Sequence, residues 1–84
     1  MKYYVTTTEQ KYPATEGGSM VEYMTKSDPR DTEKTARSLY LDTVKNINDN
    51  LSDHGHAYAL IELRNSLGVL EKYVLGEYVD NGGI

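Results

Sequence analysis

The segment Asp53-His54-Gly55-His56 holds the side chains of this sequence best suited to metal chemistry. Histidines at alternate positions of a strand point to the same side, and Asp53 could add an oxygen ligand. A structural zinc site takes four protein ligands and a catalytic one takes three, and the sequence has two histidines and no cysteine. We therefore favour two surface histidines, and expect no metal ion and no cofactor. A small-molecule or metal-binding domain using Asp53, His54 and His56 is the alternative.

Three glutamates, Glu62, Glu71 and Glu77, fall in segments expected to be strands. General acid–base catalysis needs two carboxylates, or a carboxylate and a histidine, in a water-poor pocket where burial shifts their pKa values. Strand alternation instead favours solvent-facing positions beside Arg64 and Lys72, where cross-strand ion pairing is the simpler interpretation. No serine or threonine lies in a nucleophile motif. We predict that the protein is not an enzyme.

Tyrosine is the unusual feature of the composition, since the sequence has eight tyrosines and neither Phe nor Trp. A large apolar ring with a polar tip suits half-buried and interface positions. One helix can cover only one face of the expected sheet, so the opposite face is left to solvent or to a partner. We expect that face to carry Tyr58 and Tyr73, with Leu60 and Leu75. The alternative is that these tyrosines form ordinary cross-strand contacts on a solvent-exposed face.

Length and charge limit the classes of function. A chain of 84 residues makes one domain with a thin two-layer core, in which a deep catalytic cleft is hard to build. Thirteen acidic and nine scattered basic residues give a net charge of −4, so we expect no direct nucleic-acid binding. The sequence contains neither a signal-like first segment nor a long apolar run, so we expect a cytoplasmic protein without membrane association.

The first half of the sequence predicts two strands and a helix. Segment 2–10 is rich in Tyr, Val and Thr, which predicts a strand. Segment 19–26 is predicted as a second strand, although its Met, Glu and Lys would also suit a helix, and the connection containing Pro and Gly favours a hairpin. Asp28 as cap, Pro29 at the first position and Asp31 at the third predict a helix start.

Apolar residues then recur at three- and four-residue steps, so we expect a helix over about residues 29–51, ended by Gly55. The solvent-facing side of this helix carries Asp42 and Asp49.

The second half predicts two further strands, about 56–64 and 69–79, separated by turn residues. In the first of these, Ala57 and Ala59 suit a face that a helix approaches closely. The second is apolar on both faces, which favours a central strand or half of an interface, with Gly76 at a bulge. The expected fold is α+β, a ββαββ domain over residues 1–79 with a mainly antiparallel four-stranded sheet, one helix on one face, and a flexible tail at 80–84.

The order of the segments KYYVTTTE, VEYMTKSDPRDTEKTARSLYLDTV and ALIELRNSLGVLEKYV resembles small, mostly uncharacterised proteins of Gram-positive bacteria and their phages. Some proteins of this size and build from mobile elements are inhibitors of host defence, including anti-CRISPR proteins, which act by docking on a target. The resemblance spans most of the chain and assigns no functional residue. It implies that an inhibitor function is one form this chain could take.

The sequence thus predicts a small non-enzymatic interaction module that docks on a protein partner or forms a homodimer. The candidate contacts are on the open sheet face, on a strand edge or on the acidic side of the helix. The predicted contact residues are Tyr58, Leu60, Tyr73, Leu75, Asp42 and Asp49.

Overall fold

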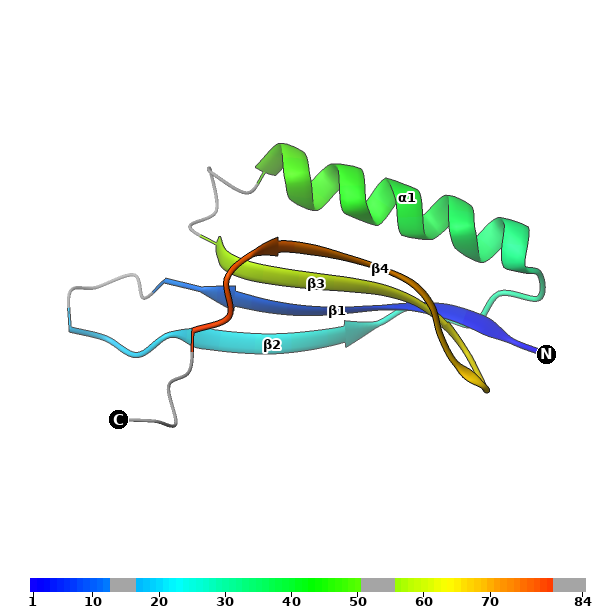
Figure 1. The fold of residues 1–84 in the computed structure, drawn as a ribbon, viewed down its shortest axis with the longest axis horizontal. Coiled ribbons are helices and arrows are strands. Elements are labelled where there is room, and N and C mark those ends of the chain that lie inside the picture. The colour runs from blue at the N-terminus through cyan, green and yellow to red at the C-terminus, as the bar shows by residue number, and fades with distance from the viewer. Residues whose placement is uncertain (13–16, 51–55, 80–84) are drawn as a thin grey trace.

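The computed structural model has one four-stranded antiparallel sheet with a single helix packed on one face (Figure 1). It describes residues 1–12, 17–50 and 56–79. In chain order the elements are β1 (Tyr3–Lys11), β2 (Val21–Lys26), α1 (Glu33–Asn50), β3 (His56–Asn65) and β4 (Gly68–Gly76). The predicted ββαββ fold of the α+β class is confirmed.

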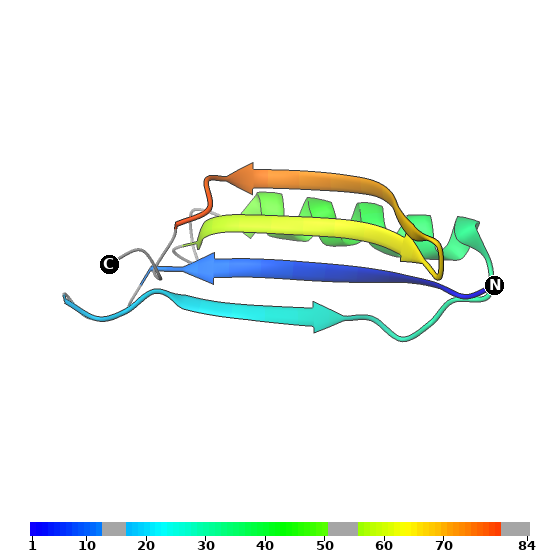
Figure 2. The same ribbon diagram turned by 60° about the horizontal axis from the view of Figure 1, so that its bottom comes forward.

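The strands lie in the order β2-β1-β3-β4, so β1 and β3 form the centre of the sheet (Figure 2). β1 pairs antiparallel with β3 from Tyr3 opposite Asn65 onward. Because β1 already occupies one side of β3, the tight turn after Asn65 returns β4 along the other side. Of the two alternatives for the fourth strand, the central position is wrong, because β4 is an edge strand, and half of an interface stays a prediction.

The core lies between α1 and the two central strands. Ala59, Ile61 and Leu63 of β3 are fully buried, as the alternation of this segment predicts. Ala36 of α1 is also fully buried, and Tyr40 follows it one turn later at 3% exposure. Small residues on both elements let the helix approach the sheet closely.

The helix begins at Glu33, four residues later than the Asp28-Pro29 signal predicts. Backbone hydrogen bonds between Arg30 and Tyr3 hold this segment against the start of β1 in extended geometry, which prevents helical bonding there. Thr32 is the cap instead, because its Oγ1 accepts a hydrogen bond of 3.2 Å from the Thr35 N–H. Gly55, expected to end the helix, lies outside the described residues.

The fourth strand ends at Gly76 rather than at Val79. Gly76 has φ +72°, and a Cβ at this position would lie 2.2 Å from the carbonyl oxygen of Ala57. Only glycine fits both constraints, and the chain leaves the sheet edge here and crosses toward β1 (Figure 1). The predicted tail at 80–84 lies outside the described residues.

Candidate interaction surfaces

The sheet face opposite α1, called here the open face, carries apolar and charged side chains together. Directly opposite residues of neighbouring strands share a face, so the register defines its members. They are Tyr4, Thr6, Thr8, Gln10, Glu22, Met24, Lys26, Tyr58, Leu60, Glu62, Arg64, Val69, Lys72 and Val74. No described helix or strand covers this face (Figure 1).

The structure separates the four apolar residues predicted to share this face. Tyr58 and Leu60 lie on it, as predicted, but Tyr73 and Leu75 lie on the helix side, opposite Ile61 and Ala59. Leu75 packs against the core there.

The cause is an irregularity in the pairing of β3 with β4. Arg64 lies opposite Val69, but Leu63 lies opposite Glu71, so Leu70 is an extra residue in β4. Such a bulge moves every following side chain to the other face. The predicted bulge was placed at Gly76, and the sequence gives no signal at Leu70.

Residues 77–79 close one end of the open face. The Gln10 amide Nε2–H donates to the Val79 carbonyl at 2.7 Å, and the Val79 N–H donates to Gln10 Oε1 at 2.7 Å. The edge of one ring meets the face of the other between Tyr78 and Tyr58, with centroids 5.3 Å apart. Gln10 is consequently buried at 1% exposure. Sequence analysis missed this clasp between Gln10 and Val79.

The rest of the open face is half-buried on the central strands and exposed on the edge strands, and its charges are of both signs. Lys26 Nζ lies 4.2 Å from the centre of the Tyr4 ring, a cation–π contact. Arg64 pairs with Glu62 at 3.5 Å, while Arg64 Nε is buried without a hydrogen-bond partner among the described residues. The same holds for Thr6 Oγ1. Both atoms belong to residues of the open face, and two such atoms are within the few that native proteins of this size contain.

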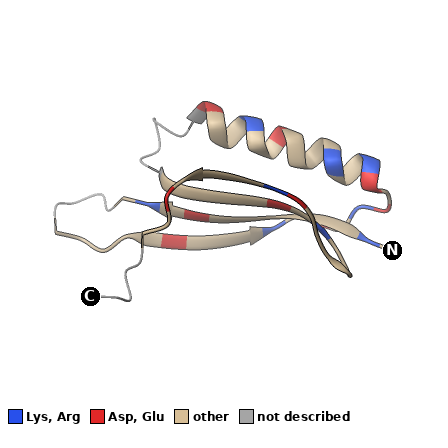
Figure 3. Cartoon of the chain, in the orientation of Figure 1, with Lys and Arg blue, Asp and Glu red and all other residues tan. Residues whose placement is uncertain are grey.

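The outer side of α1 carries both predicted acidic contacts, Asp42 and Asp49, and both are exposed. Asp49 forms an ion pair with Lys45 at 2.9 Å, and this hydrogen bond and charge raise the pKa of the Lys45 amine. Blue and red bands are mixed along the helix (Figure 3). The helix presents mixed charge rather than a continuous acidic stripe.

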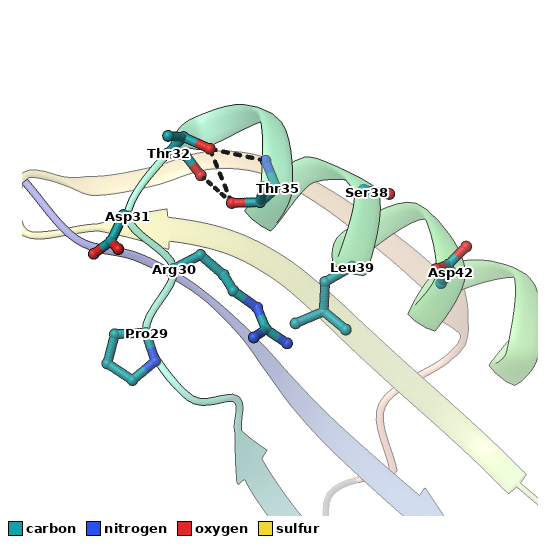
Figure 4. Close-up of a pocket in the computed structure, with 8 residues that line it drawn as sticks. All are labelled: Pro29, Arg30, Asp31, Thr32, Thr35, Ser38, Leu39 and Asp42. Atoms are coloured by element: carbon teal, nitrogen blue, oxygen red, sulfur yellow. Dashed lines mark hydrogen bonds between the residues drawn. The ribbon is translucent and has the colours of Figure 1, made fainter.

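A shallow hollow of about 580 Å³ lies beside the start of α1 (Figure 4). Arg30 extends toward Leu39 in it, and Asp42 lines its far end. Asp31 forms an ion pair with Lys2, and the hydrogen bond and charge of Lys2 lower the pKa of the Asp31 carboxyl. The hollow therefore brings no pair of carboxylates together for acid–base work among its described lining residues.

A smaller space of about 240 Å³ separates α1 from β2. It is below the size of most small-molecule sites, ~300 to 1,000 Å³. Two of its polar side chains, Thr7 and Thr25, hydrogen-bond to each other through their hydroxyl groups.

The alternative ligand site at Asp53, His54 and His56 is not tested by the structure. Asp53 and His54 lie outside the described residues, and of His56 only the backbone is described, opposite Lys11 of β1. Among the described residues, no three His, Asp or Glu side chains gather as a metal site would require.

No protein-family model matches this chain, and comparisons with curated proteins and with solved structures find no match. The resemblance to small phage-type proteins therefore stays a prediction. Within the described residues, no helix is long and apolar enough to cross a membrane.

Proposed function

We propose that the protein is a small, non-enzymatic interaction module that docks on a protein partner through its open face. The observation that supports this best is a sheet face that no described helix or strand covers, and on which large apolar side chains reach solvent. Met24 is 75% exposed, Val74 49% and Tyr78 55%. Leu60 of β3 is half-buried and lies directly opposite Val74 of β4.

The charges on the open face favour a protein over a nucleic acid. Three basic side chains, on Lys26, Arg64 and Lys72, are interspersed with two acidic ones, on Glu22 and Glu62. Phosphate backbones are bound by clustered positive charge, whereas protein interfaces commonly combine an apolar centre with a polar rim of both signs.

Inhibition of a host protein by a cytoplasmic, phage-related product is the specific form of this function that the sequence resemblance suggests. The open face supports such docking better than α1 does. An acidic helix that competes for a nucleic-acid groove needs a continuous run of negative charge, and Lys45 interrupts it between Asp42 and Asp49.

The test is affinity capture from a lysate of the source organism, with a double variant of the open face, Met24→Asp with Leu60→Ser. A matched control is Leu67→Asp, in the turn between β3 and β4, where the side chain is 83% exposed. We expect one protein to be retained by the wild type and by the control, and lost by the double variant.

Circular dichroism must first show that all three proteins are folded. Capture that the double variant keeps, or that the control loses equally, would contradict docking through the open face. If the wild type retains no protein, the lysate contains no partner and the proposed docking function is contradicted.

A further inference from the structure

The outer edge of β4 is a second surface, which adjoins the open face and shares Val69 and Val74 with it. Among the described strands none pairs with this edge, and β4 contains no proline. Four of its nine residues are large apolar side chains that reach solvent: Val69 at 43% exposure, Leu70 at 41%, Tyr73 at 39% and Val74 at 49%. An unpaired strand edge of this kind is a template for a further strand.

The helix extends this apolar edge on the covered side of the sheet. Arg37 of α1 forms an ion pair with Glu71 of β4, which shows which flank of the helix faces β4. Leu41 follows Arg37 by one turn on that flank and is 57% exposed. Apolar side chains therefore surround the edge, with Leu41 and Tyr73 on the helix side and Val74 on the open side.

The charged residues of β4 already have neighbours of opposite sign within the chain. Glu71 pairs with Arg37, and Lys72 lies directly opposite Glu62 of β3. Charges commonly protect an edge strand from pairing, but here each is partly compensated.

We propose that β4 pairs antiparallel with β4 of a second copy of this chain, joining two sheets into one of eight strands. A two-fold axis normal to the sheet keeps both helices on the same face. The usable segment runs from the bulge at Leu70 to the strand end at Gly76, and its middle residue is Tyr73.

The charges of β4 also favour pairing centred on Tyr73. Pairing centred on Lys72 would place Lys72 opposite its own copy, and pairing centred on Glu71 would do the same for Glu71. Like charges directly opposite each other are destabilising. Pairing centred on Tyr73 places Tyr73 opposite its copy, Lys72 opposite Val74 and Glu71 opposite Leu75, with no like charges opposed.

One strand edge with a few side chains is a small contact, below the ~1,200 Å² typical of stable complexes. We therefore expect a weak dimer, in the micromolar range or above, that forms as concentration rises.

The test uses the absence of cysteine from the sequence, so that one introduced cysteine is unique. At the centre of the proposed pairing, two copies of residue 73 have Cβ atoms ~4.5 to 5.5 Å apart, near the separation that a disulfide requires. Tyr73→Cys should form a disulfide-linked dimer under mild oxidation about tenfold faster than either control below, because pairing raises the effective concentration of the thiol.

Two controls have comparable or greater exposure. Val69→Cys lies in β4 beyond the bulge, where the proposed pairing keeps the two copies far apart. Met24→Cys lies on β2, at the other edge and on the open face. Equal rates for all three would overturn the proposal, and faster reaction of either control would place self-association elsewhere.

Sedimentation of the wild-type chain at increasing concentration gives a second readout that does not depend on a variant. A dimer that forms with concentration and is lost in Tyr73→Lys supports pairing through β4, while a monomer at millimolar concentration overturns it. The variants of the open face leave β4 unchanged, so failure of this proposal and failure of docking through the open face are separate results.

Discussion

The two faces of the sheet differ most clearly along β3, where neighbouring residues point in opposite directions. Ile61 and Leu63 are fully buried beneath α1, whereas Leu60 and Glu62 lie on the open face and are only half-buried. Two buried polar atoms of the open face, on Thr6 and Arg64, have no hydrogen-bond partner in the described part of the chain. The covered face therefore supplies most of the stability, which leaves the open face freer to bind.

Truncation of neighbouring residues of β3 tests this difference directly. Ile61→Ala should lower the free energy of unfolding by ~2 to 5 kcal/mol, because it leaves a cavity in a closely packed core. Leu60→Ala should cost less than ~1.5 kcal/mol, since its side chain is only half removed from water. Urea unfolding of both variants measures the comparison. Equal losses would mean that the open face is packed as tightly as the covered one.

The path that brings the chain onto the open face depends on Gly76. Gly76→Ala should lower the free energy of unfolding by ~1 to 3 kcal/mol because of the positive φ alone. The close approach to the Ala57 carbonyl should increase this loss. Gly17→Ala is the control, because Gly17 also has positive φ, +82°, but no atom of the described residues lies within 4 Å of its added Cβ. Thermal unfolding should show the larger effect at position 76, and similar losses would exclude the steric contribution.

The clasp between Gln10 and Val79 is the exception on the open face, because it is buried and fully paired. Gln10→Ala removes two hydrogen bonds and should cost ~1 to 3 kcal/mol. The amide hydrogens of residues 77–79 should then exchange faster, because the segment loses its attachment to β1. Thr8→Ala, a half-buried residue on the same face, should leave their exchange unchanged. Slow exchange in Gln10→Ala would show that the ring contact of Tyr78 alone holds the segment.

The smallest effect on stability is expected from the hydroxyl group of Tyr40, on the covered face. Burial, and then the charge of Glu71, raise the pKa of the Tyr40 hydroxyl above its ordinary value of 10.0. The neutral form therefore stabilises the folded state fully below pH 10, and this contribution is lost as the pH rises through the raised pKa. Tyr40→Phe should show a shallower loss of stability above pH 10 than the wild type.

Tyr23 also has a raised pKa, from burial and from Glu9, and is present in both proteins. The difference between the two alkaline profiles therefore reports Tyr40, and identical profiles would contradict the effect.

Periodic features were predictable because their signal is local. The helix, the order of the elements and the inward face of β3 follow from the repeats of three to four and of two residues. The bulge at Leu70 was not predictable, because an extra apolar residue in an apolar strand changes no visible pattern. That one residue reverses the faces of Tyr73 and Leu75, and with them half of the predicted apolar contact set.

The other differences arise from contacts between distant parts of the chain. The start of α1 is set by backbone pairing of Arg30 with Tyr3, which overrides the local capping signal at Asp28. The clasp joins residues 69 positions apart, at Gln10 and Val79. Local composition carries no information on either contact.

The pairing of β1 with β3 also determines when this chain can fold. The centre of the sheet joins Tyr3 to Asn65, so a nascent chain has no partner for the inner side of β1 until β3 has left the ribosome. Closing such a long loop has an entropic cost before any core contact offsets it, which slows folding. Until then the hairpin of β1 and β2 lacks its apolar cover, and in that interval the chain is most exposed to aggregation and proteolysis.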